Sequence, residues 1–344
     1  MSQCEILTTS PTGWDEFVLQ HPHSSPYHLA DVVQVGARAF GLKNYFIVSR
    51  NAEGAISGAL PLVEQASLAF GRFLVSVPFF NYGGALATGP DSLRRLITAA
   101  ESLAKERKVQ HVELRHEQPL AGLDYALRLD KITMLLDLPA TAEALSKQLG
   151  SKLRSQIRRA EREQPVVEIG GRELIPRFYE VFRVAMHELG TPVYSRRFFE
   201  TVFDAMPTRC TLVLVNARGA VQAASFLVRY RDRMEVPWAA CMPLAKPLAL
   251  NMRLYWEMLK HSIEAGCRQF DFGRSTRGSG THRFKAQWGA QPVQLNWYYW
   301  LAPGRELPKL NQDNPRYALA ASIWRRLPRW FVNAAGPHIV KNLP

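Results

Sequence analysis

The sequence is poor in cysteine and lacks the long apolar run of a membrane-spanning helix. It has 344 residues and four cysteines, none of them spaced as a CxxC pair. This scatter argues against a disulfide framework or a zinc site and favours a reducing compartment. The most apolar stretch, 70–86, is interrupted by an arginine, a proline and paired glycines. No spanning helix is therefore expected.

Acidic residues are also few relative to basic ones. There are 30 Asp and Glu against 43 Lys and Arg, which gives a formal net charge of +13. The excess either favours an anionic partner or only keeps the protein soluble. The first residues have neither the basic start nor the apolar core of a signal peptide, so the expected location is the cytoplasm.

Metal-binding patterns are incomplete as well. The stretch HPHSSPYH offers His21, His23 and His28, but prolines interrupt it and no carboxylate or cysteine joins them. The stretch HELGT begins like a zinc-protease helix but has Thr191 where the second histidine is needed. We expect no metal and no bound cofactor.

What the chain does contain is a degenerate internal duplication. Residues 44–65 and 210–230 both predict strand, turn and strand, with Gly54-Ala55 matching Gly219-Ala220. Each copy follows a helical pattern after a proline–tyrosine step and precedes a helix and a short strand. Tyr27 matches Tyr194, and His111 matches Gln269, in the same order.

The repeated order predicts an α+β fold in which each unit is a mixed, mostly antiparallel sheet flanked by helices. It resembles the GNAT superfamily of acyl-CoA N-acyltransferase-like proteins, here in tandem. The predicted divisions are a first GNAT-like domain, a basic junction helix, a second GNAT-like domain, and a basic C-terminal tail with an amphipathic helix, at 1–140, 141–165, 166–302 and 303–344.

The junction segment 141–165 predicts one amphipathic helix. Leucines and an isoleucine recur every four residues from Leu145 to Ile157 and mark a buried stripe. Arg154 and Arg158 fall on another face. They form either a solvated surface or an anion-binding ridge at the junction of two domains.

The richest segment is FDFGRSTRGSGTHRFKAQWGAQP at 270–292. Asp271 alternates with two phenylalanines, so it points away from them. It either orients a cation or accepts an amine proton, or it is a strand-end carboxylate bound by backbone N–H groups. Arg274 stands among glycines and suits a phosphate or carboxylate, although the glycines are equally explained by a tight turn.

Standard nucleotide motifs fail in this segment. A P-loop requires lysine after Gly278, where Ser279 stands, and the acyl-CoA loop of simple GNAT enzymes requires Gln or Arg at Ser275. In a GNAT unit that loop joins the fourth strand to the following helix, which here is the stretch WAACMPLAKPLALNMRLYW. The residues there contain no glycine, which argues against a conventional acetyl-CoA site.

A family resemblance emerges from several segments together. They are FGRFLVSVPFFNYGG, VELR, LRSQIRRAER, LGTPVYSRRFF, LYWEML, the 270–292 stretch and PHIVKNL. In this order they resemble the Fem family of peptidoglycan-bridge aminoacyltransferases, and more closely the FemAB-related proteins of PEP-CTERM/XrtA exopolysaccharide systems. The resemblance implies acyl or aminoacyl transfer to an amine.

The resemblance also implies site residues. Lys285 matches the lysine of the family's F-K-x-x-[F/W]-G segment and would stabilise an oxyanion or a phosphate, with Trp288 beside it. The alternative is a strand lysine whose head reaches solvent. Asn81 and Tyr82 resemble the acceptor-side segment, or are an edge strand ending in a turn. Tyr194 is a further candidate, or it only begins a helix.

The implied donor is aminoacyl-tRNA or acyl-CoA, and the implied acceptor is an anionic, phosphorylated or lipid-linked glycan precursor. The C-terminal segment carries tryptophans among arginines. It predicts either peripheral contact with the inner membrane or a helix packed back on the domain. Two other functions stay open, namely an acyl-CoA- or acyl-carrier-dependent N-acyltransferase and a non-catalytic protein that binds RNA or an anionic glycan.

Overall fold

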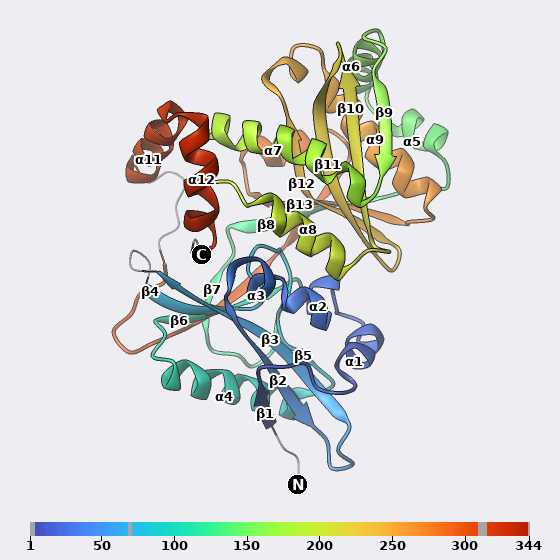
Figure 1. Cartoon of the computed structure of the whole chain (residues 1–344). Helices are drawn as coiled ribbons and strands as arrows, with labels where there is room; N and C mark the ends of the chain where they lie inside the picture. Colours follow the sequence, from blue (N-terminus) through green and yellow to red (C-terminus); the bar gives the residue numbers. More distant parts are fainter. Residues whose placement is uncertain (1–3, 68–70, 309–314, 343–344) are drawn as a thin grey trace. The chain divides into compact units, whose positions relative to one another are not determined.

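The chain forms two compact units that interleave along the sequence. The computed structural model describes residues 4–67, 71–308 and 315–342. Unit 1 comprises Met1–Lys131, Gln294–Lys309 and Lys341–Pro344, and unit 2 comprises Ile132–Val293 and Leu310–Val340. Each unit contains a mixed sheet with helices packed on it (Figure 1).

Unit 1 is built around a sheet with the strand order β1-β2-β3-β4-β6-β15-β7, with β5 paired to β3. Its core lies between this sheet and the amphipathic helix α4. The elements are β1 (Cys4–Leu7), α1 (Trp14–Gln20), α2 (Ala30–Val33), α3 (Val35–Phe40), β2 (Lys43–Arg50), β3 (Ile56–Ser67), β4 (Gly71–Val75), β5 (Leu86–Ala87), α4 (Pro90–Glu106), β6 (His111–His116), β7 (Ala126–Arg128) and β15 (Asn296–Leu301).

Unit 2 has the strand order β9-β10-β11-β12-β13-β8-β14. Its elements are β8 (Lys131–Asp137), α5 (Ala142–Gln148), α6 (Ser151–Glu161), β9 (Val166–Gly170), α7 (Ile175–Leu189), α8 (Arg196–Ala205), β10 (Cys210–Ala217), β11 (Ala220–Tyr230), β12 (Arg233–Cys241), α9 (Leu250–Glu264), β13 (Gln269–Thr276), α10 (Gly280–Ala286), β14 (Gln291–Gln294), α11 (Pro315–Arg326) and α12 (Arg329–Val340).

The predicted duplication and fold class are confirmed. The two strand orders correspond one to one, and the parallel pairs β4 with β6 and β12 with β13 stand at the same place in each. His111 and Gln269 begin the second strand of that pair in each unit. Gly54 and Gly219 both lie in hairpin turns with positive φ, 82° and 78°, where glycine carries no Cβ penalty.

The units exchange one strand each. β8 follows the last helix and strands of the first repeat, yet it pairs in the sheet of unit 2 beside β13. β15 comes after the second repeat, yet it lies between β6 and β7 in the sheet of unit 1. The predicted ranges treated the domains as contiguous, and they did not anticipate this exchange.

Two helix layers cover the sheet of unit 2. On one face α5, α6 and α9 bury an apolar core that includes Leu153 and Ile157. On the other face α7 and α8 pack an aromatic cluster in which Phe199 meets Trp238 edge to face, with ring centroids 5.2 Å apart.

The predicted junction helix is two helices. α5 ends at Gln148, Leu149 is extended, and α6 begins at Ser151 after Gly150. Glycine at this point is a poor helix former, which explains the interruption. The predicted buried stripe is confirmed, because Leu145, Leu149, Leu153 and Ile157 are all buried.

The C-terminal helices α11 and α12 pack on α7 within unit 2. Gly336 allows the close approach, since a Cβ there would lie 3.0 Å from the backbone nitrogen of Val193. Parts of the predicted tail, 309–314 and 343–344, lie outside the described residues. None of the helices described in the structure is long and apolar enough to cross a bilayer.

Candidate active site

The candidate site begins where β12 and β13 separate. These parallel strands pair only over their first three residues, ending with Glu235 opposite Asp271. β12 then continues to Cys241 against β11, while β13 continues to Thr276. Backbone groups of β13 beyond Asp271 are thereby released from this partner strand.

Buried ionisable side chains gather at the point of separation. Asp271 is fully buried, Glu235 is 4% exposed and Lys285 is 7% exposed. An oxygen of Asp271 accepts hydrogen bonds from the Thr133 hydroxyl at 2.6 Å and from the Gly273 N–H at 2.8 Å. Buried charges are costly unless they are paired or hydrogen-bonded, so a cluster of this kind marks a functional candidate.

Lys285 binds the released part of β13. Its Nζ donates to the carbonyl oxygens of Gly273, at 2.8 Å, and Arg274, at 2.9 Å. Gly273 has a φ of +73°, which turns the strand locally as a bulge does. An ammonium group carries three N–H donors, and the two carbonyls take two of them.

Burial lowers the pKa of Lys285 to about 8, although the charge of Asp271 acts to raise it. The exposed Arg274 and the buried Glu235 contribute smaller, opposite effects. Lys285 is thus a cation near neutral pH that loses its charge in a mildly alkaline solution. In a site with little water, such a cation exerts a strong field on a nearby oxygen.

The alternative of a strand lysine with a solvated head does not hold. Lys285 lies in helix α10, which Ser279 caps by accepting from the His282 N–H at 3.2 Å. Phe284, the preceding residue, meets Tyr255 edge to face at 4.9 Å. Trp288 is 1% exposed and belongs to the apolar core. Its role as a substrate contact stays a prediction.

The two arginines of the predicted basic ridge, Arg154 and Arg158, lie in different surroundings. Arg154 is half-buried and donates to the carbonyl oxygens of Leu149 and Ser146, which lie at the end of α5. These contacts satisfy carbonyls that the helix itself leaves open. Arg158 is exposed on α6. Phosphate binding by either arginine, or by Arg274, stays a prediction.

The equivalent place in unit 1 is filled by the chain itself. Ser76 donates its N–H to the carbonyl oxygen of Glu113 at 2.9 Å, and Gly84 donates to that of Arg115 at 2.9 Å. The Arg115 guanidinium binds the Glu113 carboxylate and the carbonyl oxygen of Phe80, both at 2.6 Å. The loop 76–84 therefore binds the edge of β6 beyond the point where β4 ends.

Asn81 and Tyr82 belong to this loop. Tyr82 is 4% exposed and stacks near Tyr27, with ring centroids 6.4 Å apart. Asn81 is half-buried. Their predicted contact with an acceptor remains untested, and the structure gives Tyr82 a packing role in unit 1.

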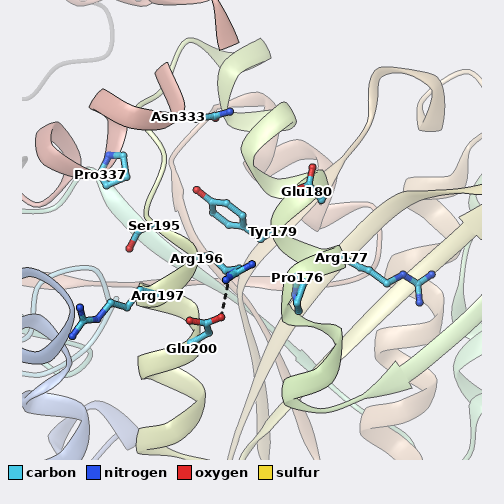
Figure 2. A pocket seen from close by; sticks show the side chains of 10 residues that line it. All are labelled: Pro176, Arg177, Tyr179, Glu180, Ser195, Arg196, Arg197, Glu200, Asn333 and Pro337. Atoms are coloured by element: carbon cyan, nitrogen blue, oxygen red, sulfur yellow. Dashed lines mark ion pairs between the residues drawn. The ribbon is translucent and has the colours of Figure 1, made fainter. Parts of the chain in front are cut away.

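Tyr194 adjoins a separate cavity on unit 2. Its ring stacks on Phe198, with centroids 4.6 Å apart, and the next residue, Ser195, caps α8. The cavity has a volume of about 500 Å³, and Figure 2 shows Tyr179 extending toward the α12 residues that line it. The lining consists of Pro176, Arg177, Tyr179, Glu180, Ser195, Arg196, Arg197, Glu200, Asn333 and Pro337.

Most charges around this cavity are paired. Arg196 binds Glu200 at 3.0 Å, and Arg177 binds Glu168 at 2.6 Å. For Arg197 no side-chain partner is present among the described residues. The cavity lining thus carries three arginines against two glutamates.

Sequence reasoning missed Glu235 and Thr133. Glu235 is the single acid in β12, whose other residues after Arg233 are apolar, and that signal was visible. Thr133 lies on β8, the exchanged strand, and only the three-dimensional pairing brings it to Asp271.

The histidine-rich stretch is structural. His28 is buried, and its ring bonds the carbonyl oxygen of Gly84 at 2.8 Å. Burial lowers the pKa of His28 to about 4. Among the residues that the structure describes, no group of three potential ligands is arranged to hold a metal.

Comparison with known proteins agrees with this architecture. Residues 147–286 match the family model described as an acetyltransferase (GNAT) domain. FemX is similar in structure over 92% of this chain and 100% of its own, with a TM-score of 0.64 and 15% sequence identity. No curated protein matches the chain.

Two further solved structures cover nearly the whole chain. L-PGS from Bacillus licheniformis aligns over 93% of this chain and 98% of its own, with a TM-score of 0.56 and 13% identity. A tandem GNAT protein from the clavulanic acid biosynthesis pathway aligns over 90% and 100%, with a TM-score of 0.52 and 14% identity. The chain therefore has a tandem GNAT-like fold, and residues 147–286 are similar to the acetyltransferase (GNAT) domain.

Proposed function

We propose that the protein transfers an acyl or aminoacyl group to an amine, and that unit 2 carries the reaction. The observation that carries the proposal is the separation of β12 and β13 directly after the buried pair Glu235 and Asp271, with Lys285 bound to the released strand. Unit 1 fills the same place with its own loop, so it offers no equivalent site.

In the proposed reaction the amine nitrogen attacks the acyl carbonyl carbon and forms the new C–N bond. The bond from that carbon to the ester oxygen or thioester sulfur of the donor breaks, and the departing atom takes a proton. Lys285 would place its third N–H at the oxyanion that forms, which is where a fixed cation assists most. Asp271 or Glu235 would receive the amine proton.

We further propose that the acceptor is an anionic, phosphorylated or lipid-linked glycan precursor of the cell envelope. The net charge of +13 supports an anionic substrate. Arg154, Arg158 and Arg274 are the proposed phosphate contacts, with Asn81, Tyr82, Tyr194 and Trp288 as further substrate contacts. The Fem-like and exopolysaccharide-linked sequence features support the envelope assignment.

For the donor, we favour aminoacyl-tRNA over acyl-CoA. The connection from β12 to α9 contains no glycine, and Ala249 adopts a left-handed backbone with a φ of +56° at the start of α9. In simple GNAT enzymes, backbone N–H groups of the corresponding turn bind a pyrophosphate. In this chain, residues with side chains line that turn. This feature disfavours, in our proposal, a conventional acyl-CoA loop.

The donor is tested with a labelled pool of aminoacyl-tRNAs and, separately, with acetyl-CoA, using UDP-glucosamine as an amine-bearing phosphorylated probe. We expect labelled product from the tRNA pool and its loss after RNase treatment. Product formed from acetyl-CoA and insensitive to RNase would instead support the CoA-dependent alternative.

A further inference from the structure

The turn between α11 and α12 exposes apolar side chains together with positive charge. Trp330 is 74% exposed and Phe331 is 40% exposed, and their rings meet edge to face at 5.9 Å. Leu319 and Ile323, four residues apart on α11, are 62% and 52% exposed. Residues four apart share a helix face, so this side of α11 is apolar.

Three arginines flank the same turn, two at the end of α11 and one at the start of α12. Arg325, Arg326 and Arg329 are all exposed, and Arg329 forms a long ion pair with Glu188 at 3.9 Å. We use the name "C-terminal tip" for Leu319, Ile323, Arg325, Arg326, Arg329, Trp330 and Phe331. No acidic residue lies between Leu319 and Phe331.

The inner side of the same helices is anchored. Val332, Gly336 and Val340 are buried, and the His187 ring bonds the carbonyl oxygen of Leu327 at 3.2 Å. At Gly190 a Cβ would lie 2.4 Å from the carbonyl oxygen of Ala321, so the two segments touch closely. The exposed tip is thus held on a fixed base.

We propose that the C-terminal tip docks the protein on the surface of an anionic lipid bilayer. Trp and Phe insert at the headgroup boundary, and leucine and isoleucine add apolar area below it. The arginines pair with anionic headgroups, each adding to the attraction. Apolar side chains at the centre of the tip favour a bilayer over RNA, which would be bound by the arginines alone.

This proposal extends the proposed function, because a docked enzyme would meet a lipid-linked acceptor at the membrane. Membrane docking is measured by vesicle binding, which requires no catalysis. If the protein binds vesicles but transfers no acyl group, the proposed function is rejected and membrane docking stands. If it transfers acyl groups but does not bind vesicles, only the docking proposal is rejected.

The test uses the full chain and co-sedimentation with vesicles of phosphatidylcholine, with or without one third phosphatidylglycerol. We expect binding to the anionic vesicles that weakens as salt rises. The double variants Trp330→Ser/Phe331→Ser and Arg325→Glu/Arg326→Glu should each lower the partition coefficient about tenfold or more.

Val166→Ser is the matched control, since Val166 is also an exposed apolar residue, at 64%, but lies on β9. It should bind like the wild type. The proposal is overturned if the wild type shows no preference for anionic vesicles, or if both double variants bind as well as Val166→Ser. Loss of tRNA binding in the arginine variant without any vesicle binding by the wild type would assign the tip to RNA.

Discussion

At the scale of single residues, the central feature is a lysine buried against backbone carbonyl groups. Lys285 donates to the carbonyl oxygens of Gly273 and Arg274, and in the proposed reaction its third N–H meets the oxyanion. Its lowered pKa follows mainly from burial. The charged form is needed for the proposed role, so pH provides a direct probe.

We expect kcat/KM to fall as pH rises above about 8, because Lys285 then loses its proton. Lys285→Arg should retain activity at alkaline pH, since arginine stays charged. Lys285→Met should lower kcat by about 10²-fold or more, as expected for a lost oxyanion donor. A circular-dichroism melting curve of each variant checks that the fold is intact.

A second prediction concerns the buried ion pair of unit 1. Arg115→Met leaves the Glu113 carboxylate buried without its partner, which costs about 3–5 kcal/mol of unfolding free energy. Arg115 also holds the pKa of Glu113 below its ordinary value of 4.5 against the effect of burial. The pair therefore contributes stability above that pH and loses it as the pH falls.

Denaturant unfolding of the wild type, Arg115→Met and Glu113→Gln/Arg115→Met measures this effect. The double variant should be less destabilised than Arg115→Met. Equal stability of wild type and Arg115→Met would show that the pair does not stabilise unit 1.

The sequence allowed Lys285 and Asp271 to be singled out, but not what surrounds them. Alternation correctly turned Asp271 away from its phenylalanine neighbours, which lie in the apolar core. One alternative placed Lys285 on a strand with its head in solvent, whereas Ser279 starts a helix there. A capping serine among glycines is too weak a local signal to predict that helix from the sequence.

At the scale of elements, the C-terminal helices depend on small residues at their contacts. Gly336→Leu forces a side chain into the backbone of Val193, a contact already at 3.0 Å for a Cβ. We expect α12 to loosen at a cost of about 1–3 kcal/mol. Hydrogen exchange of residues 329–340 reports this loosening.

Ala334→Leu is the matched control, because Ala334 is exposed on the same helix. Faster exchange in Gly336→Leu but not in Ala334→Leu is the expected pattern. Identical exchange in the two variants would mean that close contact at Gly336 is unimportant.

Element identity was largely predictable, but the junction segment shows where periodicity misleads. A stripe of leucines every four residues is compatible with one helix or with two helices joined by an extended residue. Gly150 was the available signal for a break. The buried stripe persists in both cases because α5 and α6 contribute to the same core.

At the scale of the whole molecule, each sheet is completed by a strand from the other repeat. Periodicity and internal repetition predict the order of elements within a repeat, and that prediction is confirmed. They contain no information on which sheet a terminal strand joins, since β8 and β15 are both largely apolar. Strand exchange is decided by long-range pairing.

Exchange makes the folding of unit 1 depend on residues near the end of the chain. Tyr298 lies in β15 and pairs with Leu114 of β6 and Leu127 of β7. Tyr298→Pro removes a ladder hydrogen bond in the middle of the sheet and should cost about 3 kcal/mol or more. Tyr298→Phe, which loses only the hydroxyl, is the control.

Hydrogen exchange of residues 111–116 measures the effect. Faster exchange there in Tyr298→Pro, with Tyr298→Phe near the wild type, is expected. Unchanged protection of β6 in the proline variant would contradict the pairing.

The most direct test of the central claim is donor turnover by wild type and Lys285→Met, measured side by side with aminoacyl-tRNA and acetyl-CoA in the presence of UDP-glucosamine. The account predicts that the wild type consumes aminoacyl-tRNA and forms an N-aminoacyl product about 10²-fold faster than Lys285→Met. Equal rates for the two proteins, or no consumption of either donor by the wild type, would contradict the assignment of this site as the centre of acyl transfer.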